Sequence, residues 1–155
     1  LSSSPEDTAV AKIQKALAKL EAEKPVDAVL LPFGLGHHVD HLVVRNAALA
    51  FAAPRACAFY EDLPDAFRST VVLDEVAHVE RSLMRESNLF KDALSAVVLG
   101  AIAEPAESAK IKRRVVSVYA SQIDGATMEA ISSFASHYEG GERVWANDAW
   151  LSSSF

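Results

Sequence analysis

A short apolar run near the N-terminus constrains the fold more than any other feature of this chain. The segment Asp27-Ala28-Val29-Leu30-Leu31 contains no polar residue after its first position. A strand with one solvated face alternates apolar and polar side chains, whereas a parallel strand covered on both faces by helices does not. The run therefore predicts a buried strand within a layered α/β domain.

Helix signals surround this strand and lead to a second one. Ser4-Pro5-Glu6-Asp7 combines a capping serine, a proline suited to the first helical turn and acids near the positive end of the helix dipole. Residues 42–53 are rich in alanine and precede Pro54, which indicates a helix, and residues 55–60 indicate a second strand. The order helix, strand, helix, strand predicts a Rossmann-like parallel sheet flanked by helices.

The second half of the sequence carries weaker patterns. We expect one domain over residues 1–150 and a tail over residues 151–155, with Gly140-Gly141 marking a turn. The predicted elements are a short strand at 71–73 and helices at 75–90, 92–102, 109–123 and 128–138.

Composition limits the possible partners. The 155 residues are 50% hydrophobic, enough for one core, and the net charge of -6 argues against nucleic-acid binding. No apolar stretch approaches the roughly 20 residues of a membrane span. The single cysteine, Cys57, cannot form an internal disulfide, which is typical of a reducing compartment, so we expect a cytoplasmic protein in which Cys57 packs in the core.

Polar side chains with metal-binding potential follow the first predicted strand. His37, His38, Asp40 and His41 lie within five positions, after a loop that contains Pro32, Gly34 and Gly36. Parallel sheets place ligands at the carboxyl ends of their strands. The second strand ends in Tyr60-Glu61-Asp62. We therefore expect both groups to line one pocket.

The spacing alone leaves several roles open. His38 and His41 share a face if they lie in a first helical turn, and Asp40 is either a helix cap or the acceptor that orients an imidazole. A catalytic zinc needs about three protein ligands, so two histidines do not complete a site. A solvated turn capped by Asp40 is the other interpretation. Glu61 and Asp62 are candidates for metal ligands, for substrate binding or for capping the next turn.

The motif also resembles a known family. Gly36-His37-His38-Val39-Asp40-His41, after a strand and a proline-glycine loop, is similar to the H-x-D-H signature of the PIG-L, or LmbE-like, zinc-dependent N-deacetylases. Tyr60-Glu61-Asp62-Leu63-Pro64 and the segment Tyr119-Ala120-Ser121-Gln122, placed on a helix, resemble two weaker family segments in the expected order. The resemblance spans roughly residues 26 to 123.

The resemblance implies a reaction and a role for each residue of the motif. It implies Zn²⁺-dependent hydrolysis of an N-acetyl group, on an N-acetylglucosamine-type sugar or glycoconjugate. His41 would be the metal ligand, and His38 would stabilise the oxyanion or protonate the leaving amine. Asp40 would orient one of these histidines. From their place at the carboxyl end of the second strand, we expect Tyr60, Glu61 and Asp62 to line the pocket and contact the substrate.

One departure from the family pattern is large. The His-Pro-Asp-Asp signature, which supplies the family's other metal ligands and its general base, does not occur in this sequence. We therefore expect the C-terminal portion of a deacetylase, a sheet that lacks its first strand or strands, and an edge that an N-terminal segment or a second copy covers. The alternative is a degenerate, non-catalytic module of the same fold that binds a sugar or a partner.

Overall fold

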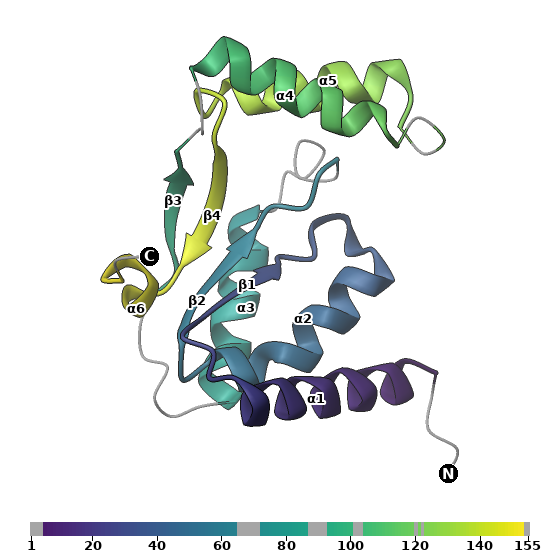
Figure 1. Ribbon diagram of the computed structural model, residues 1–155. Helices are drawn as coiled ribbons and strands as arrows, with labels where there is room; N and C mark the ends of the chain where they lie inside the picture. Colours follow the sequence, from purple (N-terminus) through teal and green to yellow (C-terminus); the bar gives the residue numbers. More distant parts are fainter. Residues whose placement is uncertain are drawn as a thin grey trace.

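The computed structural model describes residues 5–64, 72–86, 93–100, 104–119, 121 and 123–153 (Figure 1). A single 3₁₀ turn, η1 (Leu35–His37), precedes α2. The strands are β1 (Ala28–Pro32), β2 (Ala56–Tyr60), β3 (Ser95–Leu99) and β4 (Glu142–Ala146). The helices are α1 (Pro5–Glu23), α2 (Val39–Ala52), α3 (Val72–Glu86), α4 (Pro105–Ser117), α5 (Gly125–Ser136) and α6 (Asp148–Leu151).

The four described strands form one sheet in the order β1-β2-β4-β3. The pair β1–β2 is parallel, whereas β4 runs antiparallel to both β2 and β3. The predicted α/β class is confirmed, but the sheet is mixed rather than parallel throughout. The reason lies in the connection: α4 and α5 follow β3 as a pair of packed helices, and the chain returns to the same end of the sheet, so β4 runs back along β3 (Figure 1).

The two faces of the sheet are packed differently. One face meets α2 and α3 in the main core, where Phe33 contacts Phe59 edge-on and also lies against Trp145. The other face carries small buried side chains, Ala58 and Ala146 among them, with Trp150 of α6 packed against them. Helix α1 packs against α2 on the side away from α4 and α5 (Figure 1). No described helix is long and apolar enough to cross a membrane.

The first half of the chain follows the predictions closely. Helix α1 begins at Pro5, and the two predicted strands and the helix between them are present with small shifts at their ends. Cys57 is fully buried, and burial raises the pKa of its thiol to about 12, which confirms a core role. Leu30 of β1 is 47% exposed, and among the described residues β1 pairs with β2 alone.

Two predictions for the second half are wrong, and one strand was not predicted. Residues 95–99 form β3 where a helix was expected, and Val72 and Leu73 begin α3 where a strand was expected. The short run Glu142–Ala146 forms β4, which was not predicted. In each strand, β-branched or aromatic side chains pair with residues far away in the sequence, so tertiary packing outweighs the local alanine-rich composition.

One buried amide joins the C-terminal segment to β2. Asn147 is 4% exposed, and its Oδ1 accepts hydrogen bonds from the backbone N–H groups of Cys57 at 3.0 Å and Trp150 at 2.9 Å. Its Nδ2 donates to the carbonyl oxygen of Arg55 at 2.8 Å. This side chain therefore both caps α6 and fixes α6 to the start of β2.

Replacing Asn147 by alanine should destabilise the fold. The Asn147→Ala change leaves buried N–H and carbonyl groups without partners, and we expect the free energy of unfolding to fall by about 2–4 kcal/mol. Gln14→Ala, an amide replaced at an exposed position of α1, is the matched control and should change it by less than about 1 kcal/mol. Urea denaturation followed by circular dichroism measures both, and equal losses would contradict the anchoring role.

Candidate functional site

The carboxyl ends of β1 and β2 lie side by side. Pro32 is in register with Tyr60, and the backbone N–H of Phe33 donates to the carbonyl oxygen of Tyr60 at 2.9 Å. The loop that carries the histidines therefore begins directly beside residues 61 and 62. This register brings the two strand ends together. The expectation that both groups line one pocket is only partly met, because His41 alone of the residues in these groups lines the cleft described below.

The loop between β1 and α2 has a tightly defined shape. Gly34 has a φ of 83°, and a Cβ atom there would lie 2.9 Å from Cδ2 of Leu42. Leu35 is buried, and Nη1 of the buried Arg45 donates to the carbonyl oxygen of Phe33 at 2.7 Å. Arg45 also pairs with Glu75 of α3 at 3.6 Å. Position 34 therefore requires glycine, and contacts from α2 and α3 fix the loop in place.

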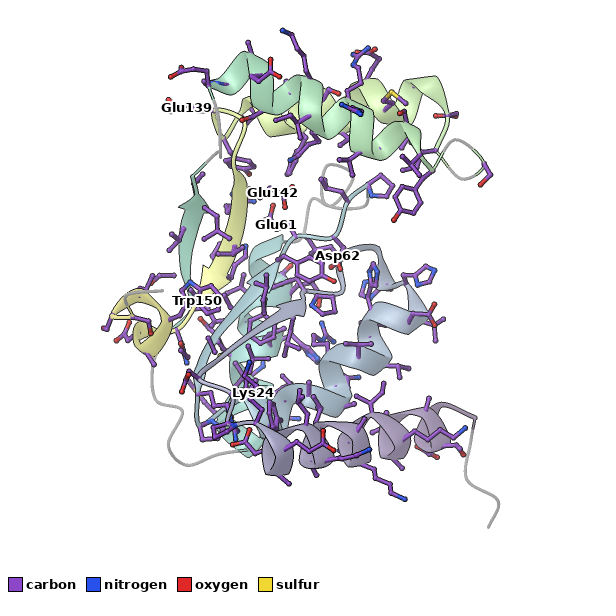
Figure 2. All side chains as sticks on the ribbon, in the orientation of Figure 1. Lys24, Glu61, Asp62, Glu139, Glu142 and Trp150 are labelled. Atoms are coloured by element: carbon purple, nitrogen blue, oxygen red, sulfur yellow. The ribbon has the colours of Figure 1, made fainter. Side chains whose placement is uncertain are left out.

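A buried carboxylate joins this loop to the histidine motif. Asp62 is 1% exposed, and its Oδ2 accepts hydrogen bonds from the backbone N–H groups of Gly34 and, at 2.9 Å, of Leu35. Its Oδ1 lies 2.9 Å from Nδ1 of His41. Burial raises the pKa of Asp62, and the two N–H donors and the imidazole of His41 oppose this rise. Figure 2 shows Asp62 beyond the end of β2.

His41 lies between this carboxylate and the surface. Its side chain is 35% exposed, whereas its Nδ1 atom is buried and has no hydrogen-bond partner among the described residues. Nδ1 of His41 is therefore close enough to Asp62 for an ion pair, but the ring is not oriented for a hydrogen bond to the carboxylate. Because Nδ1 faces Asp62 and the ring lines a cleft, the Nε2 edge is the one left for a ligand.

His38 and Asp40 are more exposed than His41. His38 is the N-cap of α2, and its Nδ1 accepts a hydrogen bond from the backbone N–H of Asp40 at 3.3 Å. The ring of His38 lies 5.2 Å from that of His41, measured between centroids. The carboxylate of Asp40 is 83% exposed and lies 3.9 Å from Nδ1 of His38. The helix cap is thus His38 rather than Asp40, and the carboxylate beside His41 belongs to Asp62.

The other predicted residues at the end of β2 are engaged with the protein. Glu61 is buried, and its Oε1 accepts hydrogen bonds from Nε of Arg143 at 2.6 Å and Nε1 of Trp145 at 2.9 Å. It therefore fixes β4 to β2 (Figure 2). Tyr60 is half-buried, and burial followed by the charge of Asp62 raises the pKa of its hydroxyl.

The described residues do not make a complete metal site, but one of them could contribute to such a site. His41 offers a ring nitrogen at the cleft, and a carboxylate on the opposite nitrogen of the ring is typical of metal-bound histidines. Among these residues, however, no group of three or more His, Cys, Asp or Glu side chains could hold a metal ion. His41 therefore suits one position of a set that needs about three protein ligands.

A cleft of about 820 Å³ opens beside His41. One wall is the segment after β2, which includes Leu63 and Pro64. The other is α4 with Tyr119, Ile131 of α5 and the turn that leads into β4. Tyr119, which was expected on a helix, follows the end of α4 and lines the same cleft, whereas residues 120 and 122 lie outside the described residues.

Two residues that support the histidine loop were not predicted from the sequence. Arg45 donates to the carbonyl oxygen of Phe33, and Glu75 forms an ion pair with Arg45. The signal for Arg45 was available, because it is a charged residue in the alanine-rich apolar face that begins α2, four positions after His41. Glu75 had no comparable signal, since its place beside Arg45 depends on how α3 packs against α2.

Removing the Asp62 side chain should destabilise the fold more than removing that of Asp40. Asp62→Ala leaves the buried N–H groups of Gly34 and Leu35 without acceptors, and we expect the free energy of unfolding to fall by about 2–4 kcal/mol. Asp40→Ala, the matched control on the exposed side of His41, should cost less than about 1 kcal/mol. Denaturant unfolding compares them, and a similar loss for both would argue against a structural role of Asp62.

Comparisons with known proteins relate this site to deacetylases. No family model matches the chain. It is 34% identical over 114 residues to 2'-N-acetylparomamine deacetylase of Streptomyces fradiae, and the match covers 72% of this chain and 36% of that protein. The chain thus spans about a third of the length of this curated relative.

Two solved structures share the fold. The zinc-inhibited form of teicoplanin deacetylase Orf2 superposes with a TM-score of 0.63 at 22% identity, covering 94% of this chain and 55% of that chain. A deacetylase-bog complex from the biosynthesis pathway of teicoplanin gives a TM-score of 0.62 at 22% identity, with 94% and 56% covered. The chain therefore has the α/β fold of these deacetylases and is similar in sequence to a further one.

Proposed function

We propose that this chain belongs to a zinc-dependent N-deacetylase of the PIG-L, or LmbE-like, family. The substrate would be an N-acetylated sugar or glycoconjugate, and the products acetate and the free amine. The observation that carries the proposal is the site itself, in which His41 of the H-x-D-H motif faces a cleft and is supported from behind by a buried carboxylate. The sequence similarity to 2'-N-acetylparomamine deacetylase supports the same type of reaction, and the fold shared with teicoplanin deacetylase Orf2 is compatible with it.

In this proposal His41 is a metal ligand and Asp62 positions it. Asp62 is itself held by two backbone N–H groups, so its Oδ1 has a fixed location 2.9 Å from Nδ1 of His41. A proton on Nδ1 would face the carboxylate at ion-pair distance, which leaves the lone pair on Nε2 for the metal. The remaining ligands and the general base would come from outside the described residues.

His38 is placed to act on the reacting amide rather than on the metal. Its ring lies beside that of His41 and is mostly exposed at the first turn of α2. Because its Nδ1 accepts the backbone N–H of Asp40, its Nε2 would carry the proton and would donate it, either as a hydrogen bond to the oxyanion of the tetrahedral intermediate or to the leaving amine. Zinc, when bound, would polarise the acetamide carbonyl and lower the pKa of a water molecule.

The two histidines should fail in different ways when replaced. In the natural full-length protein, His41→Ala should abolish both zinc binding and the release of acetate from methyl N-acetyl-β-glucosaminide. His38→Ala should keep the zinc and lower kcat by roughly 100-fold or more, because it removes only a group that acts on the transition state. Metal analysis by mass spectrometry and an acetate assay measure the two effects.

His78→Ala is the matched control, since His78 is exposed on α3 and should affect neither quantity. Full zinc and full turnover in His41→Ala would refute the assignment of the metal ligand. A full-length protein that binds no zinc and releases no acetate from any N-acetylated amino sugar would instead favour a non-catalytic module.

A positioning role for Asp62 can be tested without measuring turnover. Asp62→Asn keeps the size of the side chain and one acceptor oxygen, but it removes the negative charge beside His41. We expect zinc affinity, measured by competition with a chelator, to fall by about 10- to 100-fold. Asp40→Asn is the control and should change the affinity by much less. Unchanged zinc affinity in Asp62→Asn would show that the carboxylate only supports the loop.

A further inference from the structure

The cleft beside His41 has an apolar wall that the proposed chemistry does not use. Helix α4 presents its basic side chains Lys110 and Arg113 to solvent, while Ile111, Val115 and Val116 line the cleft. Ile111 and Val115 are 37% and 57% exposed. Contiguous apolar surface left open to water in this way commonly marks a place where a ligand or partner binds.

The charge inside the cleft is balanced. Lys112 and Glu142 both line it, and their Nζ and Oε1 atoms form an ion pair at 2.7 Å. The side chain of Lys112 is only 15% exposed, so this pair is largely satisfied within the protein. Among the described lining residues no other Asp, Glu, Lys or Arg is present. The wall therefore offers no unbalanced charge to a phosphate, a carboxylate or a polyamine.

The volume of the cleft also limits which ligand it fits. A volume of about 820 Å³ lies near the upper end of the range for pockets that hold drug-sized ligands, and it is far larger than one N-acetylated sugar needs. The cleft is continuous with the site, because His41 is one of its lining residues. A substrate whose acetamide reaches His41 would leave most of the apolar wall uncovered unless the sugar carried a further group.

We propose that this apolar wall is a subsite for a neutral, apolar aglycone attached to the N-acetylated sugar. The inference rests on the deacetylase function proposed above and adds a substrate class to it. The sugar lies next to His41, and the aglycone packs on Ile111, Val115 and Tyr119. The enzyme would accordingly prefer an amphiphilic glycoside to a free or fully polar amino sugar.

The test compares two glycosides on the natural full-length protein. Methyl and octyl N-acetyl-β-glucosaminide carry the same acetamide, and both are used below the concentration at which the octyl compound forms micelles. We expect KM for acetate release to be at least about tenfold lower for the octyl glycoside, because each buried methylene favours binding. Val115→Asp, which places a charge on the wall, should bring the ratio of the two KM values close to one.

Val118→Asp is the matched control. Val118 follows α4, is 80% exposed and does not line the cleft, so its replacement should preserve the KM ratio of the unaltered protein. Circular dichroism verifies that both variants are folded. Equal KM values for the two glycosides in the unaltered protein, with acetate released from both, would overturn the subsite and leave the deacetylase function intact.

Failure of the proposed deacetylase function would give a different experimental result. If neither glycoside released acetate, calorimetric titration of the two compounds would decide the matter. Tighter binding of the octyl glycoside, lost in Val115→Asp and kept in Val118→Asp, would support the subsite on its own. Binding of neither compound, or equal binding of both, would overturn the subsite.

Discussion

The arrangement of this site depends on one buried carboxylate. Asp62 follows β2 but holds the loop that follows β1, through two backbone N–H groups, and it holds the first turn of α2 through His41. Three separate segments are thus fixed relative to each other by a single side chain. Burying a carboxylate is costly, and the raised pKa of Asp62 reflects that cost. The hydrogen bonds and the imidazole offset it, which explains why the carboxylate persists at 1% exposure.

The sequence predicted the first half of the fold because its signals are local. Pro5 starts α1, an uninterrupted apolar run forms β1, and the helix and strand that follow are ended by proline-containing segments. Their parallel pairing then brings the two polar strand ends together. The second half depends on contacts distant in sequence, since β3 pairs with β4 and β4 pairs with β2. No local pattern distinguishes their short apolar runs from helices.

The site was predictable to the level of its segments but not of its individual contacts. Spacing placed His38, Asp40 and His41 at the start of a helix, but it could not choose between Asp40 and Asp62 as the acid beside His41. That choice depends on the loop, in which Gly34 takes a positive φ and turns its N–H towards the end of β2. Likewise, Glu61 is a neighbour of Asp62 in sequence, yet it points to Arg143 and Trp145 because side chains alternate along an extended segment.

The antiparallel pair β3–β4 has a consequence for how such a protein can vary. The helices α4 and α5 are inserted between two strands that are direct neighbours in the sheet (Figure 1). Their length and composition can therefore change while β3 and β4 keep their register, and without altering β1, β2 or the loop that holds His41. His41 and the apolar wall of the cleft belong to separate stretches of the chain. Selection can consequently reshape what the cleft admits while the groups beside it stay as they are.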